Sequence, residues 1–332
     1  DKDPNGNGLA DEIPFIGATS GGENWFCDFI AAAFQPIDIQ SNYLYPENGK
    51  IKAAYVEPEY KEALKYLNKL CTEGLLSPSS FTSDGAQTRQ TIQNPSGVQV
   101  GCFTSMAPTY LINATDRAEG YDILAPLTQD NGTGYAVYGA SIPTNSFFIT
   151  KNCQYPEAAF RLGDIMMSEE MSIWNRFGKK GTDWVEPEEG DHGMFESMGY
   201  KAKIKPILAW GSPQNSHWQQ GAPAYRGYEL ACATVDSGSN IYETRIAEHL
   251  QSYLDKKPKE YITKIIYTED EINAINEIQQ NITSYRKDSV ARFIIGDWDI
   301  ESGWEDYLKE MKAIGIDEML DIVQNAYDRC NK

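Results

Sequence analysis

Residues 57–74 read EPEYKEALKYLNKLCTEG and contain the clearest helical pattern in the chain. Pro58 suits the first turn of a helix, where its missing N–H is not needed, and Gly74 suits the position just past the end. Apolar residues recur between them at the spacing that places them on one helical face. The sequence therefore predicts a helix over 57–71 whose inward residues are Tyr60, Ala63, Leu64, Leu67, Leu70 and Cys71.

The same periodicity predicts further helices towards the C-terminus. They cover residues 156–168, 269–290, 306–320 and 321–327, and the last two are separated near a turn at Gly315. The expected inward residues are Ala159, Leu162, Ile165 and Met166 in the first, and Ile272, Ile275, Ile278, Ile282 and Tyr285 in the second.

Short strand-like runs lie between the helical segments. They are residues 13–17, 98–103, 123–127, 136–138 and 147–150. Strands that alternate with amphipathic helices are typical of an α/β fold. Residues 190–239 differ, because they are rich in Gly, Pro, Ser, Gln and aromatic residues and have weak periodicity. A long irregular segment in a compact protein is usually functional or mobile.

The composition is that of a soluble globular protein with a strongly acidic surface. Of the 332 residues, 41% are apolar and 23% charged, and the net charge is −19. So negative a surface repels phosphate backbones and anionic lipid headgroups, which disfavours nucleic acid and bare membrane as partners. The six cysteines contain no CxxC pair, which argues against a zinc knuckle or a dithiol redox site and leaves their pairing open.

The N-terminal residues 1–12, DKDPNGNGLADE, have the composition of a cation-binding loop. Alternating oxygen donors and glycines suit a hard cation such as Ca²⁺, which takes about six to eight oxygen ligands. A register that starts at Asp1 resembles an EF-hand loop, and an Asx-turn loop without metal is the third possibility. We prefer the register that uses the adjacent acidic pair, with the ligands Asp3, Asn5, Asn7, the Leu9 carbonyl, Asp11 and Glu12.

Several tryptophans stand in polar, irregular surroundings. An indole offers a flat apolar face on which the C–H face of a sugar packs, while nearby amides, hydroxyls and carboxylates bind the sugar hydroxyls. Trp25, next to Asn24, and Trp210 and Trp218 have such groups nearby. Packing in the core is the alternative for each of them taken singly.

Sequence signatures of catalysis are mostly missing. The chain has no G-x-S-x-G motif, and the Gly-rich stretch at residues 17–22 lacks the Lys-Ser/Thr of a phosphate loop. The histidines His192, His217 and His249 share no metal-ligand spacing. A carboxylate pair for glycoside hydrolysis stays open, because no feature selects one pair among 48 acidic residues.

The order of the motifs resembles one known family. It runs DPNGNG-x-x-DEIP, PEYKEALKYLNKL-x-x-EGLL, YPEAAFRLGDIM, FG-x-x-GTDW and, near the C-terminus, ARFIIG, GIDEML and QNAYDR. This order resembles the family 1 extracellular solute-binding proteins, the carbohydrate-type lipoproteins of ABC importers, including maltodextrin- and alginate-oligosaccharide-binding proteins. The resemblance implies a two-lobed α/β fold of the periplasmic-binding-protein type (type II), with ligand held in the cleft by hinge closure.

The resemblance also implies a domain organisation. We expect residues 1–118 to be the first piece of the C-terminal lobe, 119–260 to return to the N-terminal lobe, and 261–332 to complete the C-terminal lobe. Much of the N-terminal lobe, a signal peptide and a lipidated cysteine are expected upstream. The alginate type has a calcium loop at this point, and it maps onto Asp3, Asn5, Asn7, Leu9, Asp11 and Glu12.

The sequence therefore predicts a monomeric, extracellular, lipid-anchored oligosaccharide-binding protein that serves an ABC permease, with structural Ca²⁺ and no enzymatic activity. The expected ligand contacts are stacking on Trp25, Trp210 and Trp218 and hydrogen bonds from Glu23, Asn24, Ser105 and Asn215. Three alternatives remain: a secreted glycoside hydrolase or lyase, a binding protein for a peptide or another small solute, and a calcium-dependent adhesion module.

Overall fold

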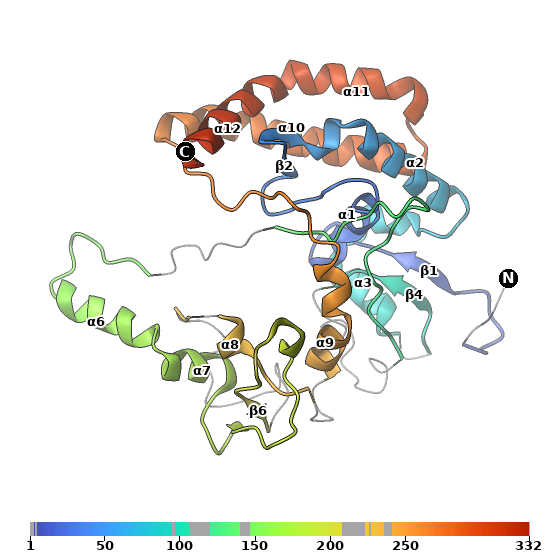
Figure 1. Ribbon diagram of the computed structural model, residues 1–332. Helices are drawn as coiled ribbons and strands as arrows, with labels where there is room; N and C mark the ends of the chain where they lie inside the picture. The colour runs from blue at the N-terminus through green and yellow to red at the C-terminus, as the bar shows by residue number, and fades with distance from the viewer. Residues whose placement is uncertain are drawn as a thin grey trace. The chain divides into compact units, whose positions relative to one another are not determined.

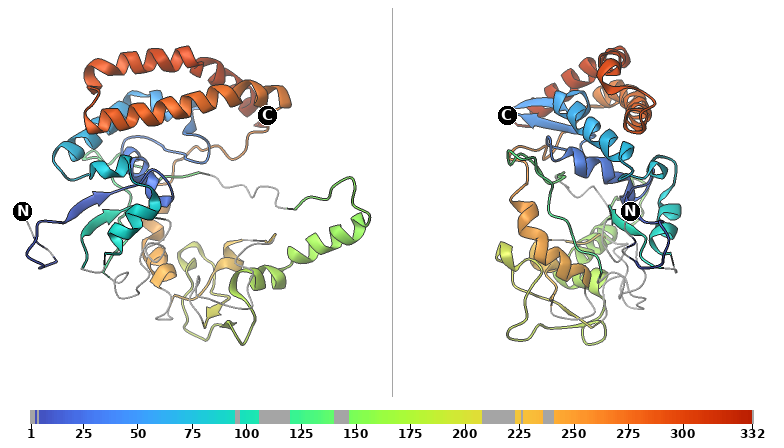
Figure 2. Two further views of the ribbon diagram at one scale, coloured as in Figure 1. Left: turned by 180° about the vertical axis from the view of Figure 1, so that it is seen from behind. Right: turned by 90° about the vertical axis from the view of Figure 1, so that its right-hand side faces the viewer.

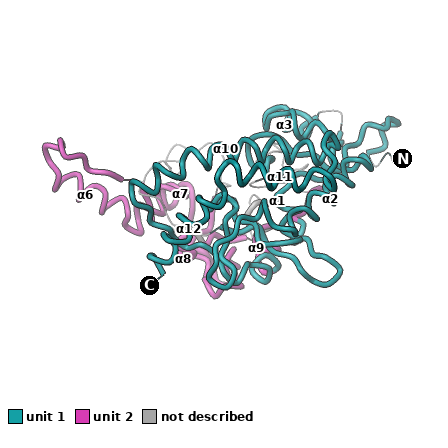
Figure 3. The backbone as a smooth tube through the Cα atoms, turned by 90° about the horizontal axis from the view of Figure 1, so that it is seen from above, with its two compact units in different colours: residues 1–117, 124–142, 252–332 teal, residues 118–123, 143–251 magenta. Residues whose placement is uncertain are grey.

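The computed structural model describes residues 3, 5–94, 97–105, 120–139, 147–207, 223–225, 227–235 and 241–331. The chain divides into two compact units, which Figure 3 colours separately. Unit 1 comprises residues 1–117, 124–142 and 252–332, and unit 2 comprises residues 118–123 and 143–251.

Unit 1 contains two small sheets. Strand β1 (Ile13–Ile16) pairs in parallel with β4 (Val100–Phe103), and β2 (Leu44–Glu47) pairs antiparallel with β3 (Lys50–Ala53). Asn48 and Gly49 join β2 to β3 with φ values of 52° and 76°. Both residues thus adopt the left-handed conformation that a tight hairpin turn requires, and an Asn-Gly pair tolerates it well. The strands expected at 13–17 and 98–103 are confirmed with slightly shorter bounds.

Helices cover these sheets within unit 1. They are α1 (Phe26–Ala31), α2 (Pro58–Thr72), α3 (Gly85–Ile92), α10 (Glu269–Ile295), α11 (Ile300–Ile314) and α12 (Ile316–Cys330), together with the 3₁₀ turns η1 (Gly22–Trp25), η2 (Ala54–Val56) and η3 (Pro78–Phe81). The long helix α10 lies against α2, and α11 and α12 pack on α10 (Figures 1 and 2). The helix predicted from residues 57–74 is therefore confirmed as α2.

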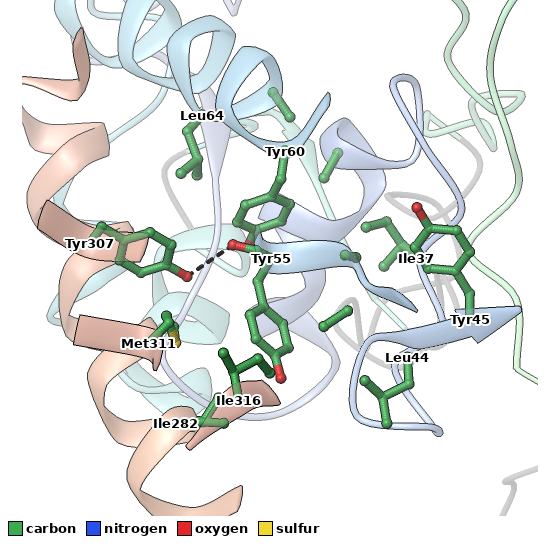
Figure 4. Close-up of a cluster of buried hydrophobic side chains, with 14 of the residues drawn as sticks. Ile37, Leu44, Tyr45, Tyr55, Tyr60, Leu64, Ile282, Tyr307, Met311 and Ile316 are labelled. Atoms are coloured by element: carbon green, nitrogen blue, oxygen red, sulfur yellow. Dashed lines mark hydrogen bonds between the residues drawn. The ribbon is translucent and has the colours of Figure 1, made fainter. Parts of the chain in front are cut away.

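The core of unit 1 lies where these C-terminal helices meet α2 and the β2–β3 hairpin (Figure 4). Its members include Ile37, Leu44, Tyr45, Tyr55, Tyr60, Leu64, Ile282, Tyr307, Met311 and Ile316. The Tyr307 hydroxyl is buried there and donates to the Tyr55 carbonyl at 3.1 Å. This bond satisfies a polar group that burial would otherwise penalise. Segments more than 250 residues apart thus share one core.

Unit 2 is built from shorter elements. It contains α6 (Pro156–Met166), α7 (Glu169–Phe177), η4 (Glu196–Met198), α8 (Tyr228–Ala231), most of α9 (Ile241–Leu254) and the antiparallel pair β5 (Trp184–Val185) and β6 (Lys205–Pro206). A small core holds it together: Phe177, Trp184, Ile204 and Ala233 are all buried. No helix in the described parts of the chain combines the length and hydropathy needed to span a membrane.

The bounds predicted for the last two helices are wrong. Instead of 306–320 and 321–327, α11 begins after Asp299, whose side chain caps it by accepting from the Ser302 amide at 2.8 Å. The break falls at Gly315, as expected, where φ is +115° and a left-handed residue ends the helix.

Three of the predicted strands are absent from the described residues. Residues 123–127, 136–138 and 147–150 form no strand. A strand needs a neighbouring strand, whereas residues 136–138 are held by isolated bonds to loops: Ala136 N–H donates to the Lys256 carbonyl at 2.8 Å, and Tyr138 N–H to the Ile37 carbonyl at 3.1 Å. An extended apolar run alone therefore does not establish a sheet.

The inward face predicted for 156–168 is also wrong. Helix α6 forms, but Leu162 and Ile165 are 50% and 56% exposed, and Gly163 is its buried residue. Periodicity finds the apolar side of a helix, but burial requires an element that packs against it, and no described element covers this side. All six cysteines lie among the described residues and none of them forms a disulfide; Cys232 is buried and Cys330 exposed.

Candidate ligand-binding site

The parallel pairing of β1 and β4 creates one shared edge at the carboxyl ends of both strands. Their register places Ile13 opposite Val100 and Ile16 opposite Phe103. The segments that follow the strands, residues 17–25 and 104–105, therefore leave the sheet at the same edge. Ligands of open α/β sheets bind outside the carboxyl ends of the strands, so this edge is the candidate site.

Hydrogen bonds hold the loop at residues 17–25 in place. Thr104 Oγ1 donates to the Glu23 carbonyl at 3.2 Å and so joins the two segments. Gly17 is fixed on both sides, since its N–H donates to Ser80 Oγ at 2.9 Å and its carbonyl accepts from Thr88 Oγ1 at 3.0 Å. A Cβ at Gly17 would lie 2.1 Å from the Phe26 ring, so only glycine fits. The loop is preorganised by the residues around it.

The structure brings together several of the residues that the sequence selected. Asn24 is exposed at this edge, and Trp25 and Ser105 are partly exposed. Asn24 and Trp25 end η1, while Ser105 follows β4 across the Thr104 bond. Trp210, Asn215 and Trp218 lie outside the described residues. Amide, indole and hydroxyl groups thus stand together at the edge.

Glu23 has a different position from the one expected of a ligand contact. Its side chain is fully buried (0% exposed), and both carboxylate oxygens lack a hydrogen-bond partner among the described residues. Arg89 Nη2 lies 3.8 Å from Glu23 Oε1. A Cβ added to Gly21 would lie 2.2 Å from Glu23 Oε2. In this structure the carboxylate therefore lies inside the protein beneath the loop, and the expected hydrogen bond from Glu23 to a ligand is not available.

The loop at residues 3–12 is wound around its own side-chain oxygens. Asp3 Oδ1 and Asn5 Oδ1 both accept from the Asn7 amide, at 3.0 and 2.9 Å. Asn7 Oδ1 accepts from the Leu9 amide at 2.7 Å, and Asn7 Nδ2 donates to Asp11 Oδ1 at 3.1 Å. Gly6 and Gly8 have φ values of 71° and 80°, which permits this tight wrap.

The loop residues fit a calcium ion by their donor chemistry. Glu12 Oε1 is a buried carboxylate oxygen with no hydrogen-bond partner among the described residues. Leaving such an oxygen unpaired is costly, and a cation would satisfy it. The carboxylates of Asp3, Asp11 and Glu12 do not all lie within 4.8 Å of one another. Binding would therefore need a local contraction of the loop.

A second group of titratable side chains, which sequence spacing did not reveal, lies in unit 2. Asp122, Glu248 and His249 have ligand atoms within 4.8 Å of one another. His249 Nε2 is 2.9 Å from Asp122 Oδ1, and Arg245 Nη1 is 3.6 Å from the same oxygen. Hydrogen bonds from the Ile123 backbone and from His249 lower the pKa of Asp122. The Arg245 guanidinium pairs with both carboxylates, since Nη1 also lies 3.1 Å from Glu248 Oε2, so the group is an ion-pair network.

Comparison with known proteins reveals relatives along nearly the whole chain, although no family model matches it. The chain is 24% identical to the fructooligosaccharide ABC transporter substrate-binding protein FusA of Streptococcus pneumoniae serotype 4 (strain ATCC BAA-334 / TIGR4), over 98% of this chain and 59% of that protein. It is also 24% identical to lipoprotein LipO of Bacillus subtilis (strain 168), over 98% of this chain and 62% of LipO. The chain spans about three fifths of the length of these relatives.

Solved structures give the fold. FusA carrying an EF-hand mutation, in complex with fructo-nystose, superposes on this chain with a TM-score of 0.74 at 21% identity. The superposition covers all of this chain and 66% of the FusA chain. An HMO-binding, ABC-transporter-associated solute-binding protein from Bifidobacterium longum infantis ATCC 15697 gives 0.73 at 17% identity, over 98% of this chain and 66% of its own. This chain has the fold of the extracellular solute-binding proteins.

The alginate-binding protein AlgQ2, solved without calcium ion, shows the same fold at a TM-score of 0.63 and 18% identity, over 96% of this chain and 64% of its own. The resemblance drawn from the order of the motifs and the α/β fold class are thereby confirmed.

Proposed function

We propose that the full-length protein is the substrate-binding component of an ABC importer and binds an oligosaccharide noncovalently. The observation that carries the proposal is the similarity to FusA, a fructooligosaccharide ABC transporter substrate-binding protein, over 98% of this chain. FusA is a substrate-binding protein, so this protein would hold its ligand without turnover and deliver it to the transmembrane subunits of a permease.

The carboxyl edge of β1 and β4 supports this proposal chemically. The partly exposed Trp25 ring would stack on a sugar ring, while Asn24 and Ser105 would bind hydroxyls. Trp210, Asn215 and Trp218 would add contacts. The buried Glu23 would act through the shape of the loop.

The loop at residues 3–12 would hold a structural Ca²⁺. Its ligands would be the side chains of Asp3, Asn5, Asn7, Asp11 and Glu12 and the Leu9 carbonyl. The unpaired Glu12 Oε1 and the convergence of Asp3, Asn5 and Asn7 oxygens on one turn support the proposal. Such an ion would stabilise the entry to β1 and take no part in ligand chemistry.

The importer role also implies a place and a state for the full-length protein. It would work outside the cytoplasmic membrane, anchored by a lipid at its N-terminal end, as a monomer that docks on its permease. The similarity to a lipoprotein of Bacillus subtilis supports the anchor.

Titration of the full-length protein with a glycan panel tests the proposal. The panel contains fructooligosaccharides, milk-type oligosaccharides and alginate oligosaccharides, and the readouts are intrinsic Trp fluorescence and calorimetry. At least one saccharide should bind stoichiometrically and be recovered intact. Failure of every saccharide to bind, or release of cleaved products on prolonged incubation, would contradict the proposal.

Substitutions at Trp25 test its place in the site. Trp25→Ala removes the ring and should weaken binding about tenfold, since a well-packed aromatic contact contributes about 1 kcal/mol or more. Trp25→Phe keeps a ring and should bind within a few-fold of the wild type. Equal affinities for the Ala, Phe and wild-type proteins would place the ligand elsewhere.

A further inference from the structure

Unit 2 carries an aromatic cluster that the site described above does not use. The rings of Phe195, Tyr200 and Tyr228 contact one another, and Tyr225 lies beside them through its hydroxyl, which is 2.8 Å from the position of a Cβ on Gly227. The Phe195 and Tyr228 rings meet edge to face with centroids 5.0 Å apart, and the Tyr200 ring is tilted against Tyr228 at 5.8 Å. Tyr225 precedes Tyr228 on the loop that enters α8. The cluster thus presents two exposed tyrosines backed by two partly buried rings.

The exposure of these tyrosines is large for side chains that have packing partners. Tyr228 is 51% exposed and Tyr225 is 46% exposed. A tyrosine that only fills a core buries its ring and exposes at most its hydroxyl. Here ring surface is open to solvent, and this is the surface that an apolar face of a ligand could cover.

Polar groups surround the rings. The Tyr225 hydroxyl donates to Glu229 Oε1 at 3.4 Å, and His192 Nδ1 lies 2.8 Å from Glu196 Oε2. Glu229 and Glu196 are exposed next to Tyr228 and Phe195 in sequence. Rings bordered by hydroxyl and carboxylate acceptors match a sugar, which has an apolar C–H face and a rim of hydroxyl donors.

The cluster rests on a rigid frame. Residues 232–235 form backbone hydrogen bonds with two other segments. Met194 N–H donates to the Ala233 carbonyl at 2.9 Å, and Lys203 N–H donates to the Cys232 carbonyl at 2.9 Å. Tyr200 N–H donates to the Phe195 carbonyl at 3.2 Å, so the η4 turn fixes both rings. The Tyr225 amide donates to Ser172 Oγ at 2.9 Å. A preorganised platform loses little entropy when a ligand binds.

From these observations we propose that Phe195, Tyr200, Tyr225 and Tyr228 form a carbohydrate-stacking subsite of unit 2, with a sugar ring packed on the exposed face of Tyr228. This inference rests on the proposed function, because it assigns one ring of the proposed oligosaccharide ligand to the exposed face of Tyr228. The Tyr225 hydroxyl and the Glu229 carboxylate would accept hydrogen bonds from hydroxyls at the rim of that ring.

The test uses the full-length protein and the saccharide that binds best in the glycan panel. Tyr228→Ala should raise the dissociation constant about tenfold, which corresponds to about 1.4 kcal/mol. Tyr228→Phe keeps the ring and should stay within about threefold of the wild type, because only a hydroxyl is lost. Tyr66→Ala is the matched control: Tyr66 is 44% exposed on α2 in unit 1, and its loss should leave the affinity unchanged.

The outcomes separate this inference from the proposed function. If the wild type binds no saccharide, the proposed function fails. If the wild type binds and Tyr228→Ala binds equally well, the subsite is refuted while the proposed function stands. Should Tyr228→Ala lower the unfolding temperature, Tyr228→Leu keeps apolar bulk without a ring, and weaker binding by that variant still supports stacking. Normal affinity with lost uptake in cells would assign the cluster to a protein contact and overturn the subsite.

Discussion

Asp28 is a buried carboxylate whose chemistry differs from that of a surface carboxylate. It lies in the first turn of α1, in unit 1, and is 5% exposed. The Tyr43 hydroxyl donates to Asp28 Oδ2 at 3.1 Å, and the Arg286 guanidinium lies 3.7 Å above the Tyr43 ring. Burial raises the pKa of Asp28 to about 6, although the positive charge of Arg286 and the Tyr43 hydrogen bond oppose the rise. The charged form is therefore costly in the folded protein.

This raised pKa predicts a pH dependence of stability. In the folded state Asp28 keeps its proton up to about pH 6, whereas in the unfolded chain it loses it near its ordinary pKa of 3.8. Folding thus takes up a proton between these values, so raising the pH through this window disfavours the folded state. The contribution of Asp28 to the free energy of unfolding should fall by about 2 kcal/mol between pH 4 and pH 7.

Denaturant unfolding of Asp28→Asn at several pH values measures this effect. The variant cannot ionise, so its stability relative to the wild type should rise from pH 4 to pH 7 by about that amount. Asp288→Asn, at an exposed position of α10, is the control and should show no such trend. If the difference in the free energy of unfolding between wild type and variant is the same at every pH in this range, the raised pKa of Asp28 is contradicted.

At the scale of elements, the junction of α11 and α12 depends on one glycine. Gly315 has φ +115°, and a Cβ there would lie 3.3 Å from Ile278 Cδ1 on α10. Gly315→Ala should therefore destabilise unit 1 by about 1–2 kcal/mol, because a left-handed conformation strains a residue with a side chain. The denaturation midpoint measures the loss. Lys309→Ala, exposed on α11, should leave the midpoint nearly unchanged, and an equal shift in both variants would refute the backbone explanation.

The elements also show what local sequence can predict. Helix α2 was predictable because its start signal at Pro58, its stop at Gly74 and its apolar stripe all lie within one segment. Helix α6 was predictable as a helix, but the burial of Leu162 was not, since burial depends on a partner elsewhere in the chain. Residues 136–138 failed as a strand for the same reason. Propensity is local, whereas packing and pairing are not.

The candidate site was predictable in composition but not in geometry. Asn24 and Trp25 stood out because an amide adjoins an indole, yet only the pairing of β1 with β4 brings Ser105 to the same edge. Nothing near Glu23 in sequence indicates that its side chain turns inward. Tyr228 lies in an irregular stretch without periodicity, and an aromatic-rich, Gly-rich composition was the one signal available for it.

At the scale of the whole molecule, the loop at residues 3–12 links the start of the described chain to a distant segment. Asn5 Nδ2 donates to the Val98 carbonyl at 3.2 Å, and Asp11 Oδ2 accepts from Gln99. Residues 98 and 99 lead into β4, and residues 11 and 12 lead into β1. An ion that orders this loop would therefore also order the entry to the parallel pair that carries the candidate site.

Calcium should accordingly stabilise the folded protein. An ion that binds only the folded state contributes about 2.7 kcal/mol when its concentration is 100 times the dissociation constant. The unfolding temperature, followed by calorimetry, should rise by several degrees when Ca²⁺ is added to chelator-treated protein. Mg²⁺ at equal ionic strength should have a much smaller effect, because it demands a tighter octahedral site.

The Asp3→Asn variant distinguishes stabilisation by a bound ion from stabilisation by the hydrogen bonds of the loop. The amide keeps an oxygen that can accept from the Asn7 amide, as Asp3 Oδ1 does at 3.0 Å, but it removes the acceptor of the Gly8 amide, which donates to Asp3 Oδ2 at 2.6 Å, and one negative charge. The chelator-treated variant should therefore unfold somewhat below the chelator-treated wild type, and its rise with Ca²⁺ should need more than about tenfold higher Ca²⁺, because affinity follows ligand charge. If Ca²⁺ shifts neither protein, or shifts both identically, the loop is held by its Asx hydrogen bonds alone and binds no calcium.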